Sequence, residues 1–390
     1  MCKRISQFSI ILCITAMSWS CSNQEKGEGS QQMTPKNYET YVADSVTFEY
    51  LSPVELLDYD EPSQEMILKD RLTKEILIVD GKGELLTKFN PHQQGPGYVG
   101  DFDFGWTFYG EDQLICYGRY YFYQLTRQGE YIAKHKYPVD VVGLWLLDYN
   151  PEMAITYTSN KKLMLLAFIT EPDGPRYNTQ AFQDSVHMIY KMDLAAGTAA
   201  PVMQKKPESI YRTLGSYVDR GWPYFAQVDN NKVVVTYSID DKFYLYDAET
   251  NELLQEFEIP EAFKPKFESI PFESKGSADV YSASTRVLSD GKHIILRVRG
   301  MIPASVERVL SRQDNWRESQ AYKEAREKYA TSESLLYDLS GQYLGTVKNG
   351  AGMLSYDAES TSDGFYWIQR RYSDERDYKT FLKIKVAPEN

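Results

Sequence analysis

The sequence predicts an all-β fold, a six-bladed β-propeller of four-stranded antiparallel blades with one helical insertion. A pair of short apolar strands recurs six times, at intervals of about 50–70 residues. Turn-forming residues precede the first strand of each pair, and several second strands run into hairpins that contain Gly, Asp or Asn. Aromatic residues make up 14% of the 390 residues, a composition that suits half-buried strands better than helices.

The expected strands follow the same order in each of the six repeats. The first strands of the six pairs are residues 65–68, 113–116, 163–166, 233–236, 293–296 and 365–368. The second strands are residues 76–79, 121–124, 188–191, 243–246, 334–337 and 381–384, and outer strands follow at 85–89 and 253–257. Each repeat therefore forms a small antiparallel sheet, a meander. One meander cannot bury both of its faces alone, whereas several meanders stacked radially bury each other's faces. A large β-sandwich is the alternative for the same strands. Residues 45–49 are expected to pair beside the last blade and close the ring.

Four aspartates recur where expected strands end: Asp80, Asp193, Asp247 and Asp338. An aspartate at such a position can accept a hydrogen bond from the backbone two residues further on and close a hairpin. We interpret these residues in that way rather than as a ring of metal ligands. We expect no metal site in this chain.

The N-terminus has the pattern of an export signal. Lys3 and Arg4 precede a mostly apolar segment, residues 5–17, which is too short to span a bilayer as a helix. Cys21 then begins a polar stretch. We expect residues 1–20 to be a lipoprotein signal peptide, residues 21–44 a flexible tether and residues 45–388 the propeller.

The cysteines favour lipidation of Cys21. Cys2 and Cys13 would leave with the signal peptide, and Cys116 alone would remain in the folded body, where its apolar neighbours predict a buried thiol. An ordinary secretory leader with a chance cysteine is the alternative. Acyl chains on Cys21 would anchor the protein to a membrane, since each buried CH₂ contributes about 0.8 kcal/mol.

Residues 89–98, Phe-Asn-Pro-His-Gln-Gln-Gly-Pro-Gly-Tyr, resemble the Gly-x-Gly-Pro-Gly-Glu-Tyr motif of six-bladed, TolB-like propeller lipoproteins of Gram-negative bacteria. The first Gly of that motif is missing here, and Tyr98 follows Gly97 without the Glu. The resemblance also covers the leader and the rhythm of the blades. It implies a cell-envelope location on the outer membrane, facing the periplasm or the surface, and it implies no particular activity.

The charge and the motifs exclude several function classes. The net charge of −12 argues against a nucleic-acid partner, because phosphates require a basic footprint. Gly95, Gly97 and Gly100 spell a dinucleotide-binding pattern, but no strand and helix flank it as that fold requires, so we expect a loop. The sequence contains no P-loop, HExxH, CxxC or GxSxG motif. We therefore expect no cofactor.

Two insertions interrupt the rhythm, at residues 171–187 and at residues 303–332, where the apolar spacing becomes helical. The helical insertion is either packed on the propeller end or a lid or docking surface. In a four-stranded meander, connections between second and third strands emerge at the same end as connections between blades. We therefore expect that end to be the functional one, because functional residues sit on loops held by a rigid scaffold.

The leading hypothesis is a lipid-anchored envelope protein that binds a ligand or a protein partner without catalysis. The alternatives are a glycan hydrolase or lyase with carboxylates at the central channel, and a structural subunit of an envelope complex. Arginines can bind carboxylates and aromatic rings can stack on sugar or peptide faces. The ligand would then be an acidic glycan or a peptide carboxylate. The candidate ligand-binding residues in the connections are Arg71, Arg119, Arg176, Arg299, Arg371, Trp222 and Tyr98. The alternative is that these arginines pair with neighbouring Asp and Glu residues.

Overall fold

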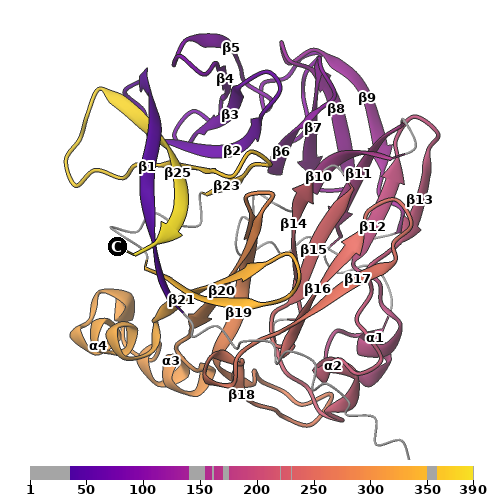
Figure 1. Cartoon of the computed structure of the whole chain (residues 1–390), viewed down its shortest axis with the longest axis vertical. Helices are drawn as coiled ribbons and strands as arrows, with labels where there is room; N and C mark the ends of the chain where they lie inside the picture. Colours follow the sequence, from indigo (N-terminus) through magenta and orange to yellow (C-terminus); the bar gives the residue numbers. More distant parts are fainter. Residues whose placement is uncertain are drawn as a thin grey trace, which may run out of the picture. The chain divides into compact units, whose positions relative to one another are not determined.

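The computed structural model describes residues 36–139, 154–159, 162–169, 175–219, 221–229, 231–348 and 358–389. Within these residues the chain forms six antiparallel meanders, which follow one another in sequence order around the body (Figure 1). The predicted all-β propeller with four-stranded antiparallel blades is confirmed. The expected signal peptide, Cys21 and the tether up to residue 35 lie outside the described residues.

The first three meanders are separate four-stranded sheets. Meander 1 contains β2 (Val54–Asp60), β3 (Glu65–Asp70), β4 (Ile76–Val79) and β5 (Leu85–Phe89). Meander 2 contains β6 (Asp103–Tyr109), β7 (Gln113–Gly118), β8 (Tyr121–Thr126) and β9 (Tyr131–Lys136). Meander 3 contains β10 (Ala154–Ser159), β11 (Lys162–Phe168), β12 (Ile189–Asp193) and β13 (Thr198–Pro201).

Meander 4 is a separate sheet, and the last two meanders are joined. Meander 4 contains β14 (Pro223–Asp229), β15 (Lys232–Tyr237), β16 (Lys242–Asp247) and β17 (Leu253–Glu258). Meander 5 contains β19 (Asp279–Ser289), β20 (His293–Gly300), β21 (Ser332–Asp338) and β22 (Tyr343–Lys348), with the short β18 (Lys266–Glu268) beside β19. Meander 6 contains β23 (Glu359–Ser360), β24 (Tyr366–Gln369), β25 (Tyr378–Pro388) and β1 (Lys36–Glu49).

The first strand of the chain completes the last meander. β1 pairs antiparallel with β25 along its length and parallel with β22 at its start. The expected pairing of residues 45–49 beside the last blade is therefore confirmed. Residues 36–44, which the sequence assigned to the tether, belong to the same strand. The sequence of residues 36–44 is mostly polar and does not indicate a strand by itself. The strand forms because β25 and β22, from the other end of the chain, pair with it.

The core lies between neighbouring meanders. For example, Ile67 of β3 shares one buried cluster with Trp106 of β6 and Cys116 of β7. Cys116 is a buried free thiol, as predicted, and burial raises the pKa of this thiol well above its ordinary value. The blades are thus held together mainly by apolar packing across their faces.

The aspartates that end strands close turns. Oδ1 of Asp80, Asp247 and Asp338 accepts a hydrogen bond of 2.9 Å from the backbone N–H two residues further on. Asp193 accepts the equivalent bond from Ala196, three residues on. The interpretation of these residues as hairpin-closing groups is confirmed.

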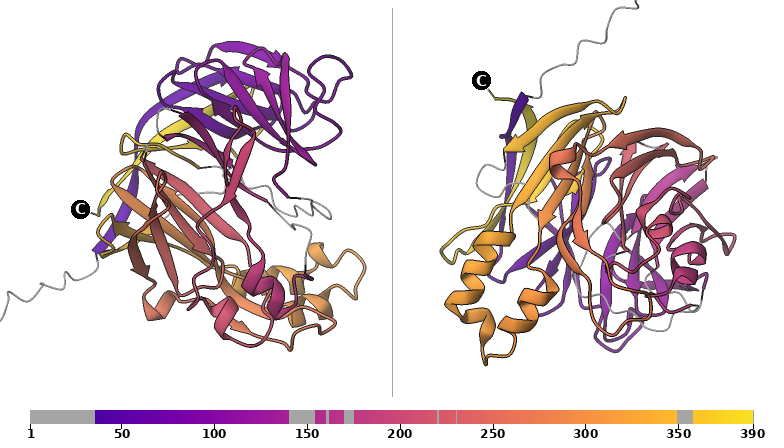
Figure 2. Two further views of the ribbon diagram at one scale, coloured as in Figure 1. Left: turned by 90° about the vertical axis from the view of Figure 1, so that its right-hand side faces the viewer. Right: turned by 90° about the horizontal axis from the view of Figure 1, so that it is seen from below.

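Four α-helices lie in the described parts of the connections. α1 (Gln180–Ser185) stands between β11 and β12, and α2 (Ile210–Thr213) stands between meanders 3 and 4. The predicted helical insertion consists of α3 (Ala304–Leu310), the 3₁₀ helix η3 (Trp316–Glu318) and α4 (Gln320–Tyr329); a second 3₁₀ helix, η2, covers Glu261–Phe263. In α3 and α4 only Ala325 is buried, so the insertion packs little of its own surface on the blades and projects from them (Figure 2). None of the helices in the described part of the chain combines the length and apolarity needed to span a bilayer.

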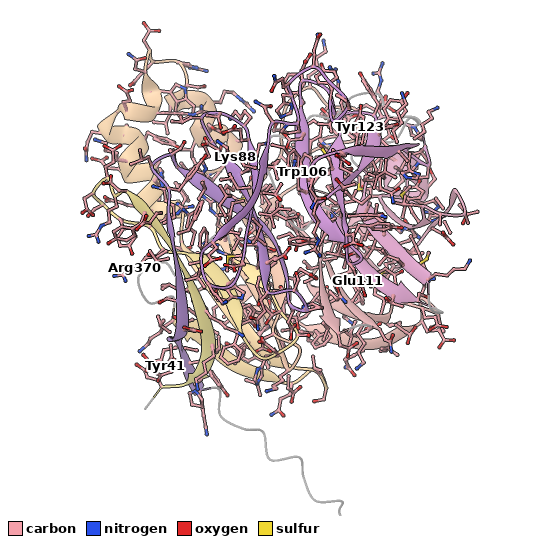
Figure 3. All side chains as sticks on the ribbon, turned by 90° about the horizontal axis from the view of Figure 1, so that it is seen from above. Tyr41, Lys88, Trp106, Glu111, Tyr123 and Arg370 are labelled. Carbon is pink, nitrogen blue, oxygen red and sulfur yellow. The ribbon has the colours of Figure 1, made fainter. Side chains whose placement is uncertain are left out.

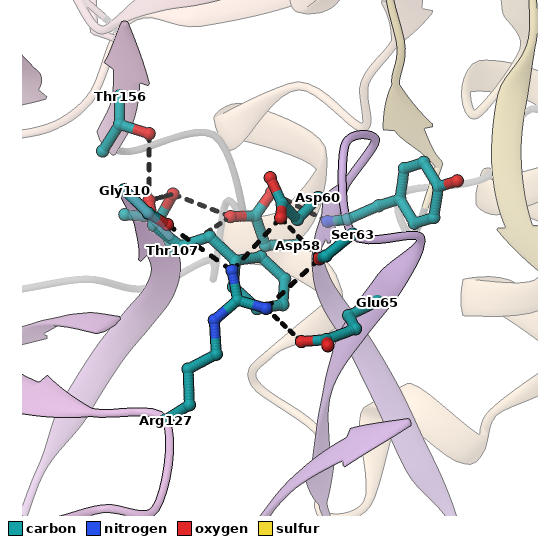
Figure 4. A network of polar contacts seen from close by, with 10 residues as sticks. Asp58, Asp60, Ser63, Glu65, Thr107, Gly110, Arg127 and Thr156 are labelled. Atoms are coloured by element: carbon teal, nitrogen blue, oxygen red, sulfur yellow. Dashed lines mark hydrogen bonds and ion pairs between the residues drawn. The ribbon is translucent and has the colours of Figure 1, made fainter. Parts of the chain in front are cut away.

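One arginine connects the first two meanders at their turns. Arg127, in the turn between β8 and β9, forms ion pairs with Asp60 at 3.2 Å and with Glu65, and its guanidinium lies 4.7 Å from the centre of the Phe108 ring (Figure 4). Its Nη1 donates a 3.2 Å hydrogen bond to Ser63. Because Asp60, Ser63 and Glu65 belong to meander 1, Arg127 ties the β8–β9 turn to the β2–β3 turn.

Candidate functional site

The propeller has two ends with different connections. We call loop end the set of connections between second and third strands and between meanders: residues 50–53, 71–75, 90–102, 119–120, 137–139, 169–188, 202–222, 238–241, 259–278, 301–331 and 370–377, as far as they are described. The hairpin end comprises the other turns: 61–64, 80–84, 110–112, 127–130, 194–197, 248–252, 290–292, 339–342 and 361–365. The four α-helices of the described residues belong to the loop end and lie on the lower side of Figure 1, α3 and α4 at the left and α1 and α2 at the right. Figure 3 shows α3 and α4 on one side of the body, and Glu111 of the hairpin end toward the other.

Exposed apolar side chains distinguish the two ends. Among the described residues, large exposed hydrophobic side chains occur on the outer strands and in loop-end connections, and the hairpin turns carry none. Those of the loop end are Leu51, Leu72, Phe102, Tyr120, Tyr177, Leu214 and Val309. Leu51 and Leu72 are both 72% exposed, so neither side chain is packed in the core. These seven side chains lie in seven different connections of the loop end.

The charges are distributed just as unevenly. The hairpin turns carry the carboxylates Glu61, Asp80, Glu84, Glu111, Asp112, Glu130, Glu249, Glu252, Asp290 and Asp363, and the cations Lys82, Arg127 and Lys292. The described loop-end connections carry nearly equal numbers of cations and carboxylates. The negative charge of the chain is therefore concentrated away from the loop end, and anions meet less repulsion there.

Two of the sequence-predicted arginines lie in loop-end turns of meanders 1 and 2. Arg71 follows β3 and lies 3.7 Å from Glu55, an ion pair across the end of the sheet. Arg119 lies between β7 and β8, is exposed, and places its guanidinium 5.1 Å from the centre of the Tyr120 ring. Arg71 thus serves a local ion pair, whereas Arg119 and Tyr120 together present a cation and an aromatic ring to solvent.

The two predicted aromatic residues have local partners. Trp222 is half-buried just before β14, and its ring packs edge-on against Phe168 at 5.9 Å. Tyr98 donates a 2.7 Å hydrogen bond from its hydroxyl to Asp101 in the same connection. Gly97 beside it lies against the backbone of Gly129, which leaves no room for a Cβ atom. Both aromatic side chains thus have partners within the protein.

The remaining predicted arginines are Arg176, Arg371 and Arg299. Arg176 is exposed ahead of α1, and Arg371 is exposed after β24. Arg299 is the second-last residue of β20, just before the connection that contains the helical insertion. The predicted residues therefore share one end of the molecule, but the contacts of the described residues do not gather them into a single site.

Arg299 has two arginine neighbours that the sequence analysis missed. Arg297 lies two residues before it on β20, and Arg286 of β19 stands opposite Arg297 in the sheet. Burial, together with the charges of Arg286 and Arg299, lowers the pKa of Arg297 to about 10. The alternation Arg297-Val298-Arg299 was the available signal, because alternate residues of a strand share one face.

A buried lysine lies in the connection between meanders 3 and 4. Lys205 is 5% exposed, and its Nζ lies 4.7, 5.6 and 5.8 Å from the ring centres of Tyr211, Phe182 and Tyr237. Nζ donates a 2.6 Å hydrogen bond to Oε1 of Gln183. Burial lowers the pKa of Lys205 to about 8. This cage of aromatic rings holds the ammonium group through cation–π attraction and joins α1 to α2.

Two buried carboxylates have raised pKa values. Asp240 accepts hydrogen bonds from Ser209 at 2.7 Å and from the Ile210 N–H at 2.9 Å, and burial raises its pKa to about 6. Asp58 accepts a 2.7 Å bond from the Phe108 N–H, and burial raises its pKa to about 6 as well. They lie in meanders 4 and 1, and each ties one segment to the backbone of another.

A buried carboxylate also fixes the Gly-rich connection between meanders 1 and 2. Asp103 accepts hydrogen bonds from Lys69 at 2.5 Å, His92 at 3.1 Å and Trp106 at 2.5 Å. The other ring nitrogen of His92 lies 2.6 Å from the Gly100 carbonyl oxygen. Both ring nitrogens thus face acceptors, so the imidazolium form of His92 is favoured, and its pKa is raised chiefly by the bond to Asp103. In the described residues, no group of three or more His, Cys, Asp or Glu has a geometry that could hold a metal ion.

Comparisons with known proteins address the fold. No family model and no curated protein matches the sequence. Among solved structures, a DUF4221 family member from Bacteroides vulgatus matches with a TM-score of 0.60 at 11% identity, over 91% of this chain and 100% of that one. A candidate exported protein from Bacteroides fragilis matches with a TM-score of 0.45 at 10% identity, over 90% and 95% of the two chains. A gluconolactonase from Xanthomonas campestris reaches a TM-score of 0.39 at 11% identity, over 86% and 88%. The chain is thus similar in fold to the Bacteroides vulgatus protein over nearly all of its length.

Proposed function

We propose that this protein is a lipid-anchored cell-envelope propeller that binds a ligand or a protein partner through its loop end, without catalysing a reaction. The observation that carries the proposal is the placement of exposed apolar side chains. Outside the outer strands, all of them among the described residues lie in loop-end connections. Arg119 beside Tyr120 adds a cation next to an exposed ring. An acidic glycan or a peptide carboxylate would find both kinds of contact there.

The envelope location rests on the leader, on Cys21 and on the resemblance to TolB-like lipoproteins. Cys21→Ser should release the protein from the membrane fraction, because the acyl chains would have no attachment point. Labelling with a palmitate analogue and fractionation of the cells measure this, with Cys116→Ser as the control. Continued labelling and membrane retention of Cys21→Ser would show that Cys21 is not the lipid site.

The binding surface is tested with a matched pair of double variants. Phe102 and Tyr120, 59% and 44% exposed, lie in loop-end connections, whereas Tyr131 and Ile132, each 42% exposed, lie on the outer strand β9. On a panel of acidic glycans, neutral glycans and peptides, Phe102→Ser/Tyr120→Ser should weaken binding about tenfold or more. Tyr131→Ser/Ile132→Ser should leave binding unchanged. Equal effects of the two variants would contradict the proposal, and formation of a product from a panel member would favour the hydrolase or lyase alternative.

A further inference from the structure

His92 bridges two points of the connection between meanders 1 and 2. This connection covers residues 90–102 and carries the exposed Phe102. Nδ1 of His92 lies 2.6 Å from the carbonyl oxygen of Gly100, and Nε2 lies 3.1 Å from Oδ1 of Asp103. Gly100 and Asp103 stand on either side of Phe102 in the sequence. One side chain, that of His92, thus holds the backbone on both sides of an exposed aromatic residue.

Both partners of the His92 ring can only accept hydrogen bonds. A backbone carbonyl has no hydrogen to donate. Asp103 is held in its ionised form: burial alone would raise its pKa, but the hydrogen bonds from His92 and Lys69 outweigh burial and lower the pKa to about 2. Only the imidazolium form carries an N–H on each ring nitrogen. The geometry, with both nitrogens within 3.1 Å of an acceptor, therefore matches protonated His92.

The titratable groups around this ring come from three neighbouring strands. Lys69 of β3 donates a 2.5 Å hydrogen bond to the same oxygen of Asp103, which is the first residue of β6. Burial and the charge of Asp103 raise the pKa of the Cys116 thiol on β7, so this thiol is neutral. The bond to Asp103 raises the pKa of His92, and the charge of Lys69 opposes this shift. Because the ordinary pKa of histidine is 6.5, His92 is the member of this set whose protonation changes near neutral pH.

We propose that His92 is a positioning residue of the loop end: protonated, it fixes the backbone on both sides of Phe102, and deprotonated, it releases Gly100. A neutral imidazole keeps one N–H, and the ionised Asp103 is the stronger acceptor, so the bond to the Gly100 carbonyl is the one that is lost. The proposal rests on the binding function above and adds a regulation to it. Protonation of His92 favours binding, because a fixed Phe102 loses less conformational freedom when a ligand contacts it.

The rest of the connection has an anchor that does not depend on His92. The Val99 N–H donates a 2.9 Å hydrogen bond to the Pro91 carbonyl oxygen, and both residues are buried. Gly100 follows with a φ of +104°, a conformation that glycine adopts without strain, so the chain can turn between Val99 and Phe102. Loss of the bond from His92 should therefore free residues 100–102 locally and leave the connection ahead of them in place.

Hydrogen–deuterium exchange of the full-length protein from about pH 6 to about pH 9 tests the positioning, after correction for the intrinsic pH dependence of exchange. Protection of residues 100–102 should fall about three- to tenfold, the range of one hydrogen bond, as the pH rises through the pKa of His92. His92→Gln has no titrating ring and should show the low protection at every pH. His293→Gln is the matched control, because His293 also lies 3.2 Å from an aspartate, Asp290, but stands at the hairpin end. This control should behave as the wild type does.

Two further measurements connect the exchange to the ring and to binding. The ring signals of His92 in NMR spectra, assigned by their absence in His92→Gln, should titrate over the same pH range as the exchange of residues 100–102. For a glycan or peptide of the panel that the wild type binds, the affinity should fall about three- to tenfold between the two ends of this range. It should fall equally in His293→Gln and stay constant in His92→Gln. Lys205 titrates in all three proteins, so it cannot account for a difference between them.

The outcomes separate the positioning from the binding function on which it rests. Protection of residues 100–102 that does not depend on pH, or that changes equally in the wild type and in His92→Gln, would overturn the positioning role of His92. A pH-independent affinity of the wild type would overturn the regulation of binding. Absence of binding to every panel member, together with pH-dependent protection, would overturn the binding function and leave the positioning intact.

Discussion

Arg127 should be one of the most important polar residues for stability. Its side chain is 12% exposed and serves Asp60 and Glu65, which are 21% and 17% exposed, and it covers the Phe108 ring. Arg127→Met keeps the apolar stem but leaves two carboxylates unpaired. Fully buried pairs lose about 3–5 kcal/mol when one partner is removed; water reaches these carboxylates, so we expect about 2 kcal/mol. The lost cation–π contact adds about 1 kcal/mol. The free energy of unfolding should therefore fall by about 3 kcal/mol.

Urea unfolding followed by tryptophan fluorescence and by circular dichroism measures this change, since urea does not screen the ion pairs. Arg119→Met is the matched control, because Arg119 also stacks on a ring but is exposed, so its replacement should cost less than about 0.5 kcal/mol. Arg127→Met combined with Glu65→Gln should show a coupling of about 1–2 kcal/mol. If Arg127→Met and Arg119→Met unfold alike, the ion pairs do not hold the two blades together.

Three further predictions follow from buried groups and from the closing strand. Burial lowers the pKa of Lys205 to about 8, so above that pH the folded protein has released a proton that the unfolded chain still binds up to about pH 10. The unfolding free energy of the wild type relative to Lys205→Met should rise by up to about 3 kcal/mol between pH 7.5 and 10 in urea titrations, and a constant difference would contradict this. The pKa of His92 is raised, so its contribution to stability is present below about pH 6.5 and is lost as pH rises through its folded pKa. His92→Gln should remove that loss, and an unchanged pH profile would show that the imidazolium is unimportant. A chain ending at residue 374 lacks β25 and should give the circular dichroism of an unfolded protein; a native spectrum would show that the ring needs no closing strand.

The middle strands of each blade could be predicted because they are buried on both faces and form continuous apolar runs. Run 76–79 coincides with β4, which is buried throughout. The outer strand expected at 85–89 also coincides with β5, although β5 is largely exposed. The innermost strands were not predicted individually, although the four-stranded blade required them. In β2 the register shifts between Leu56 and Asp58, and β6, β14 and β19 carry similar irregularities. An irregularity of this kind breaks the alternation of side chains that sequence patterns rely on.

The candidate site was predictable only in part for a related reason. Searching the connections for arginines finds Arg299, because it stands near the end of its strand. Arg286 and Arg297 lie inside strands, and only the register of β19 against β20 brings Arg286 opposite Arg297. That register depends on the irregularity next to Arg286, which no local pattern announces. Long-range pairing, rather than the identity of the residues, decides which charges meet.

The pairing of β1 with β25 also determines how the body would respond to mechanical load. Tension applied along the axis of β1 would act on this strand from its first residue, Lys36. β25 lies antiparallel along nearly the whole of β1, and β22 flanks its start. A pull toward the N-terminus therefore loads many backbone hydrogen bonds together in shear instead of opening them one after another. Drawing β1 out of a protein held by its N-terminus would therefore require these bonds to break together.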